Sequence, residues 1–219
     1  MITEPDVTFT DYGLAIECAL FSYLLCRRGN RHQPLRSWFV LFFASTSVAA
    51  LTGGTVHGFF LDVRTTGYII LWPMTLVTIG ITALVTWAIG AKIMFSGRIA
   101  HWILTLAAVE FAGYCIVVLF MIQTFRVAVL SYLPATTFLF ATLAIAYHRV
   151  RRREVLAILA GLLLTLVAAG VQTARLTPHP VYFNHNALYH SIQAAAMFMI
   201  FYGARWLMGS ARGNLHFEP

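Results

Sequence analysis

Charge is scarce in this sequence: 11% of its 219 residues are Asp, Glu, Lys or Arg, while 59% are hydrophobic. A water-soluble domain of this length cannot bury so much apolar surface, so the composition excludes a soluble globular protein. The single lysine, Lys92, falls at the end of a predicted helix and not in the middle of the last one. That position argues against a retinal-binding opsin. The composition as a whole predicts an integral membrane protein.

Cysteine is scarce as well. Cys18, Cys26 and Cys115 all lie inside hydrophobic segments and form no Cys-x-x-Cys motif, so no disulfide framework is implied. A basic segment is missing from the start of the chain, where Glu4 and Asp6 stand instead. We therefore expect no cleaved signal peptide.

Long apolar runs dominate what is present. A membrane-spanning helix needs about 20 predominantly apolar residues, and the sequence holds seven such stretches, at roughly 9–26, 37–60, 67–92, 99–122, 127–147, 154–175 and 184–208. They should be helices, because lipid tolerates no unpaired backbone and the alternation of a barrel strand is absent. The connections are short and no repeat or flexible linker interrupts the chain. Residues 1–219 are thus predicted to form one all-α domain, a bundle of seven transmembrane helices.

The basic residues predict how this bundle is oriented. Twelve of the fifteen Lys and Arg residues fall on one side of the predicted membrane: Arg27, Arg28, Arg31, Arg36, Lys92, Arg98, Arg149, Arg151, Arg152, Arg153, Arg205 and Arg212. Only Arg64, Arg126 and Arg175 fall on the other. Cytoplasmic loops carry the excess of Lys and Arg, so the N-terminus should be outside and the C-terminus in the cytoplasm. Short basic clusters between apolar runs also argue against a nucleic-acid partner. We expect a multi-pass protein of a bacterial inner membrane or a plasma membrane.

The last apolar stretch opens with polar side chains where a membrane helix should be apolar. Asn186, His190 and Gln193 are spaced four and three residues apart, so a helix places them on one stripe. Burying such a stripe in hydrocarbon is costly unless it finds partners. Other helices are therefore expected to supply those partners.

His57 and Glu17 are the predicted partners from other helices. His57 lies near the outer end of the second stretch, and Glu17 about two turns inside the first. Imidazoles from two helices with a carboxylate nearby suit zinc, which takes about three protein ligands and lowers the pKa of a bound water to about 7. We predict His57, His185 and His190 as metal ligands and Glu17 as a general base or additional ligand. Residues expected to contact a substrate or support the ligands are Asn186, Gln193, Gly53, Thr55 and Asp62. The simpler interpretation is that His57 and His190 only form hydrogen bonds between helices.

The spacing of His185 and His190 sets a condition on this zinc site. Residues five apart in a regular helix lie about 140° apart around its axis. Both can reach one ion only if the helix begins late, at about Ala187, which is the version we expect. If the helix already runs regularly through Asn184, Asn186 would replace His185, although Asn is a poor zinc ligand.

These residues give the chain a resemblance to the CREST superfamily, which contains the alkaline ceramidases and the progestin/adiponectin receptors. His57 and His190 match its histidines on the second and seventh helices, with His185 or Asn186 in place of the first histidine of the seventh-helix pair. Glu17 is similar to a first-helix acidic residue of the ceramidases. The chain departs from the family pattern at Gly53, where a serine is expected, and in having no Asp on the third helix. The resemblance implies bound zinc and cleavage of a lipid amide or ester bond.

Three functions follow as predictions. The first is a zinc-dependent intramembrane hydrolase acting on a membrane lipid, with an outward-facing site between the first, second and seventh helices. The second is a non-catalytic receptor or lipid-binding protein of the same architecture. The third is a b-type haem protein with His57 and His190 as axial ligands.

Overall fold

The computed structural model describes residues 2–28, 35–179 and 182–210. These residues form seven helices and no strand: α1 (Pro5–Arg28), α2 (Arg36–Phe59), α3 (Thr66–Met94), α4 (Gly97–Phe120), α5 (Phe125–Val150), α6 (Arg153–Thr173) and α7 (His185–Ser210). The all-α prediction is confirmed, and each predicted stretch corresponds to one helix. Arg31 and Arg212, which contributed to the predicted orientation, lie outside the described residues.

Six of the helices, α1 to α6, are long and apolar enough to cross a membrane. α7 is just as long, with 26 residues, but does not qualify on composition. His190, Gln193 and Arg205 lower its mean hydropathy, so the helix with the most polar face is also the least typical membrane helix. The chain is a multi-pass helical protein in which α7 depends on its neighbours to cover its polar side chains.

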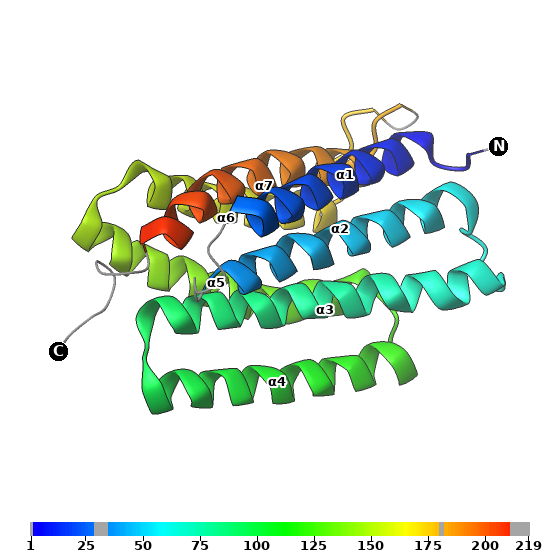
Figure 1. Ribbon diagram of the computed structural model, residues 1–219. Helices are drawn as coiled ribbons and strands as arrows, with labels where there is room; N and C mark the ends of the chain where they lie inside the picture. Colours follow the sequence, from blue (N-terminus) through cyan, green and yellow to red (C-terminus); the bar gives the residue numbers. More distant parts are fainter. Residues whose placement is uncertain (1, 29–34, 180–181, 211–219) are drawn as a thin grey trace.

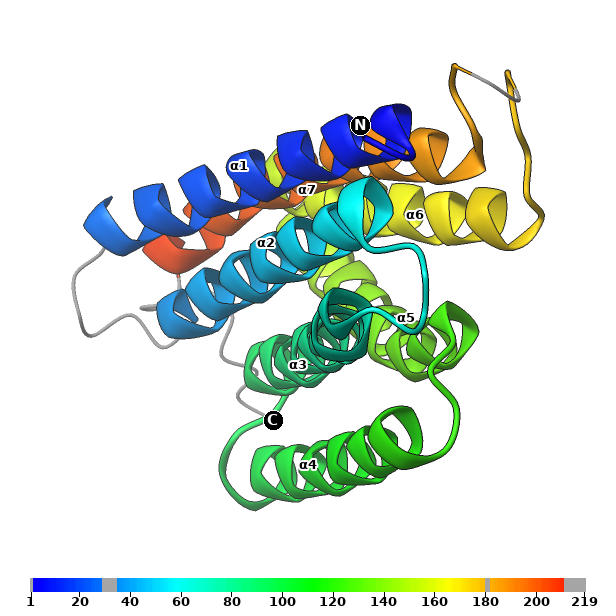
Figure 2. The ribbon, with the colours of Figure 1, turned by 90° about the vertical axis from the view of Figure 1, so that its right-hand side faces the viewer.

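Six helices close into a ring, and α4 stands outside it. In order around the ring, α1 packs on α2, α2 on α3, α3 on α5, α5 on α6, α6 on α7, and α7 on α1. α4 packs mainly against α3 and only weakly against α5. Figures 1 and 2 show α4 lying apart from the other helices, beside α3. α1 therefore lies between α2 and α7, the two helices that carry His57 and His190.

The two ends of the bundle differ in chemistry. α1 begins at one end, which we call the N-terminal end, and its acidic first turn is there. At the opposite, basic end, Lys92 Nζ lies 5.8 Å from the ring of Trp38, and the Arg152 guanidinium 5.5 Å from that of Trp206. The chain alternates in direction from helix to helix, so all described members of the larger basic group gather at this end.

Apolar side chains fill the half of the ring nearer the basic end. Phe21 of α1 stacks on Phe201 of α7 with ring centroids 4.1 Å apart and meets Phe43 of α2 edge-on at 5.5 Å. All three are buried. This aromatic contact joins α1, α2 and α7 tightly, which leaves the N-terminal half as the place where the ring can hold a cavity.

Hydroxyl pairs join α2 to α3 along their length. The side chains of Ser45 and Thr82 lie 2.8 Å apart, and those of Thr52 and Thr75 are also 2.8 Å apart. Polar pairs of this kind stabilise helix contacts in lipid, where small residues also let backbones approach closely. They fix the position of α2, and therefore of His57, against α3.

Candidate functional site

A cavity of about 300 Å³ lies inside the ring, toward the N-terminal end. All six ring helices line it, and α4 does not contribute. Much of the wall is apolar, with Leu14, Ile79, Val129 and Leu166 among its side chains. Polar groups enter from several helices: Asp11, Thr46, His57, Thr75, Thr82, Tyr132, Thr165, Gln172, Asn186, Tyr189, His190 and Gln193.

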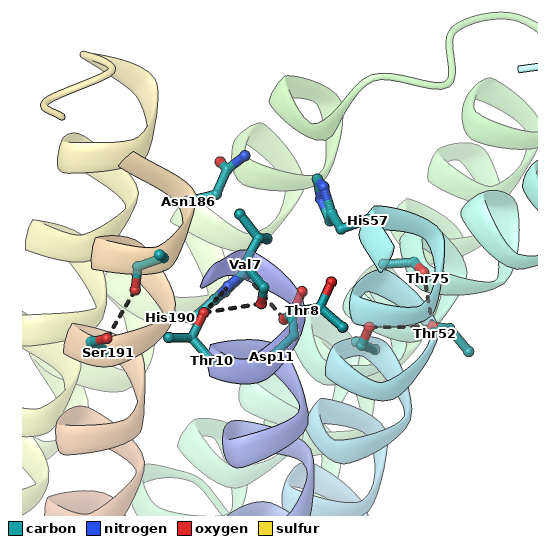
Figure 3. A network of polar contacts seen from close by, with 12 residues as sticks. Val7, Thr8, Thr10, Asp11, Thr52, His57, Thr75, Asn186, His190 and Ser191 are labelled. Atoms are coloured by element: carbon teal, nitrogen blue, oxygen red, sulfur yellow. Dashed lines mark hydrogen bonds and ion pairs between the residues drawn. The ribbon is translucent and has the colours of Figure 1, made fainter. Parts of the chain in front are cut away.

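A buried pair of ionisable side chains forms one wall of this cavity. His190 Nε2 of α7 lies 3.1 Å from Asp11 Oδ1 of α1, and both residues are more than nine-tenths buried. The hydroxyl of Thr10 lies 3.4 Å from the other ring nitrogen, Nδ1. Figure 3 shows His190 reaching across from α7 to both residues. The partner that α7 requires thus comes from α1.

The hydrogen bonds of Thr10 indicate where the protons of this pair lie. Thr10 Oγ1 is 2.8 Å from the carbonyl oxygen of Asp6 and 3.0 Å from that of Val7, so its single proton is donated to the backbone. Thr10 can then only accept from His190 Nδ1–H. The proton between Nε2 and Asp11 belongs either to the acid, giving a neutral pair, or to the imidazole, giving an ion pair. In both states the pair carries no net charge.

Gly54 of α2 lets α1 approach closely enough to place Asp11 in the wall. A Cβ atom at this position would come within 2.7 Å of Asp11 Cβ and 3.2 Å of the Tyr12 ring. Any side chain here would push α1 outward and carry Asp11 away from His190. Gly54 therefore allows α1 and α2 to pack closely at this point.

A second histidine and carboxylate hold the N-terminal end of the cavity together. His57 Nδ1 of α2 lies 2.5 Å from Glu4 Oε2, just before α1 begins. The backbone N–H of the preceding Thr3 donates to the carbonyl of Gly58 at 3.0 Å. The start of the chain is thus fastened to the end of α2, and the imidazole of His57 faces the cavity while bonded to the chain start.

The expectation that the last helix begins late, at about Ala187, is wrong. α7 begins at His185, and the side-chain oxygen of Asn184 accepts from the backbone N–H groups of Asn186 and Ala187, at 2.8 and 3.1 Å. Asn184 is a favoured type of residue at this capping position, which is why the helix can start there. His185 therefore lies about 140° from His190 around the helix. Its Nδ1 is 3.5 Å from the hydroxyl of Thr177 in the preceding loop, and it does not line the cavity.

The other predicted site residues divide into two groups. His57, His190, Asn186, Gln193 and Gly53 line the cavity together. Glu17, Thr55 and Asp62 do not.

Local geometry explains why these three residues fall outside the cavity. Glu17 is six residues beyond Asp11, hence about 120° around α1. The Thr55 hydroxyl is 3.1 Å from that of Tyr12 and bonds also to the backbone of its own helix. Asp62 is in the loop after α2, where hydrogen bonds from Arg64 lower its pKa. The carboxylates that pair with His57 and His190 are therefore Glu4 and Asp11, and not Glu17 as predicted.

The described side chains do not bring three possible zinc ligands together. Within residues 2–28, 35–179 and 182–210, no three His, Cys, Asp or Glu side chains are grouped so that they could hold a metal ion. The contacts of His57 are with Glu4, those of His190 with Asp11, and those of His185 with Thr177. Bound zinc and bound haem both stay predictions.

Fold and site together define a class: a multi-pass helical membrane protein with a partly polar cavity between its helices, lined by a buried Asp–His pair. The chain belongs to the family of unknown function DUF6962, whose model matches residues 7–208. No match was found among curated proteins or among solved structures. The match to this family does not test the resemblance to the CREST superfamily, which stays a prediction.

Proposed function

We propose that this protein binds a small, largely apolar molecule taken from the membrane, with the polar end of that molecule at Asp11, His190 and Gln193. The observation that carries the proposal is the cavity itself. Its volume of about 300 Å³ is at the lower end of the range for small-molecule sites, which are mostly apolar with a few converging polar groups. A receptor or a lipid-binding protein would use such a cavity without performing chemistry.

The proposal includes the topology. All seven helices cross the membrane, with the N-terminus outside and the cavity near the outer surface, because the basic residues gather at the opposite end. A reporter enzyme that works only in the cytoplasm should then be active when it is fused after Pro219. A tag before Met1 should be accessible on intact cells. Antibody labelling of the C-terminal tag on unbroken cells would overturn this orientation.

Filling the cavity should abolish binding. A tritiated octyl diazirine, activated by light in lipid nanodiscs, should label peptides that line the cavity, and excess octane should suppress that labelling. Ala169 lines the cavity from α6. Ala169→Phe places an aromatic ring in that space, so we expect labelling of the cavity peptides to fall to the lipid-facing background.

The matched control is Ala108→Phe. Ala108 is exposed on α4, the helix that does not line the cavity. This variant should keep full, saturable labelling of the cavity peptides. If parent and Ala169→Phe chains are labelled equally, the cavity does not bind apolar molecules and the proposal is wrong.

A zinc-dependent lipid hydrolase is the second candidate, favoured by one observation: His57 and His190 line the same cavity from separate helices. It requires about one zinc per purified chain, lost in His57→Ala and His190→Ala. The binding function requires no metal, so we expect a chelator to leave the photolabelling unchanged. Loss of labelling on chelation, with zinc found by elemental analysis, would favour the hydrolase. A Soret band in the purified protein would favour haem.

A further inference from the structure

One buried acceptor in the cavity wall has no partner. Gln193 is 6% exposed, and its Oε1 atom makes no hydrogen bond with any described residue. Its Nε2 atom donates to the hydroxyl of Thr165 at 3.4 Å, which fixes the amide against α6. Buried polar groups in native proteins nearly always have a partner, and an exception indicates a water, a ligand or a functional strain.

The position of Gln193 places this acceptor beside the ionisable pair. Gln193 follows His190 by three residues on the same face of α7, and both line the cavity. A polar group bound at the Asp11–His190 pair would therefore lie within about one helical turn of Gln193. An O–H or N–H group of the occupant would supply the donor that this acceptor lacks.

The charges at the Asp11–His190 end of the cavity disfavour an ionic group bound at that end. The Asp11–His190 pair is neutral overall in either proton arrangement, and no Lys or Arg side chain lines the cavity among the described residues. An ammonium group bound beside this pair would add an unbalanced positive charge there, and a carboxylate would add an unbalanced negative one. Either is costly in a low-dielectric site between membrane helices.

We infer that the occupant is an uncharged, single-chain amphiphile, with an apolar body and one hydroxyl or amide group that donates a hydrogen bond to Gln193 Oε1. This inference rests on the proposed binding function and specifies the chemistry of its ligand. Gln193 is the residue that distinguishes such a molecule from a plain hydrocarbon. The small volume favours one chain over the two chains of a membrane phospholipid.

The test is competition against octyl diazirine in phosphatidylcholine nanodiscs, with competitor amounts expressed as mole fraction in the bilayer. The competitors are 1-octanol, octane, octylamine and octanoic acid. We expect 1-octanol to displace the label at about a fivefold lower mole fraction than octane, which corresponds to one net hydrogen bond. Octylamine and octanoate should compete less well than octane.

In the Gln193→Leu variant, the ratio between the mole fractions of octane and of 1-octanol that displace the label should fall from about five to about one. The Thr165 hydroxyl keeps its hydrogen bond to the carbonyl of Gly161, so the variant leaves no buried group newly without a partner and should fold. Gln193→Met is a second apolar variant of similar length. Ser191→Ala is the control, because Ser191 is exposed and its hydroxyl donates to the carbonyl of Ala187 in its own helix. It should keep the fivefold preference.

Two results would overturn the inference while leaving the binding function standing. One is equal competition by 1-octanol and octane in the parent, which would mean that a water satisfies Gln193. The other is a preference for octylamine or octanoate. If the parent shows no saturable labelling, the proposed binding function itself fails.

Discussion

Asp11→Leu or His190→Leu alone should lower the free energy of unfolding by about 1–5 kcal/mol, with the low end for a neutral hydrogen-bonded pair and the high end for an ion pair. Each residue is the buried partner of the other, at 3.1 Å. Removing one leaves its former partner in the wall of an apolar cavity without the group that balances it. The measurement is reversible unfolding in mixed micelles, followed by circular dichroism.

The double variant Asp11→Leu/His190→Leu should lose much less than the sum of the two single losses. It removes both polar groups and leaves an apolar wall of similar volume, which is often nearly neutral. Neighbouring residues that interact directly are expected to deviate from additivity in this way. Strict additivity of the two single losses would show that the residues do not act as a pair.

The exposed pair Asp62–Arg64 provides the control for this cycle. It has similar geometry, with 3.1 Å between Arg64 Nη2 and Asp62 Oδ2, but both side chains face solvent. Surface ion pairs contribute little, so Asp62→Leu should leave the unfolding transition unchanged within error. Burial, and not the presence of an ion pair, would then account for the effect at Asp11.

The helices could be predicted from the sequence because the thickness of a bilayer sets their length. Each of the seven apolar runs corresponds to one helix, and the ends differ by a few residues. The largest shift is at α1, which begins at Pro5 and not at about residue 9. Pro at the first helical position and Asp6 in the first turn favour a helix start there. Because these first residues are not apolar, the apolar run in the sequence begins only at about residue 9.

The partners of the polar stripe were only partly predictable. His57, Asn186, His190 and Gln193 do meet at one cavity, as their helical spacing and depth suggested. Asp11 was missed as the partner of His190, although its position gives a signal. Asp11 follows the buried Val7 by four residues and precedes the buried Leu14 and Cys18 by three and seven. This spacing places Asp11 on the inner face of α1, and Glu17 does not share it.

The sequence prediction placed these residues by their depth along each helix and did not include how each helix is rotated about its own axis. Glu17 and His185 lie at plausible depths for a site shared with His57, but a side chain reaches a cavity only if its helix turns it inward. The rotation of α1 is set by tertiary contacts such as Gly54 against Asp11, and that of α7 by the cap at Asn184. Neither contact can be read from residue depth alone, so two of the four predicted ligand or catalytic residues lie outside the cavity.

Gly203→Ala should destabilise the protein through the contact between α6 and α7. A Cβ atom at this position would overlap the backbone carbonyl oxygen of Glu154 and the Ile158 side chain of α6. The carbonyl cannot turn away without breaking its own helix, so the two helices must separate. Overpacking of this kind costs typically 1–3 kcal/mol and occasionally more. We expect a loss of about 3 kcal/mol, measured by the same unfolding transition.

Gly170→Ala is the matched control for this prediction, because the same chemical change at Gly170 meets nothing within 4 Å. Its expected effect is neutral or stabilising by up to about 1 kcal/mol, from the higher helix propensity of Ala. A Gly203→Ala chain as stable as the Gly170→Ala chain would contradict the close contact of α6 with α7. If the contact is real, loosening it also disturbs the hydrogen bond from Gln193 on α7 to Thr165 on α6. Gly203→Ala should then weaken the preference for 1-octanol over octane as well as the fold, although Gly203 does not line the cavity.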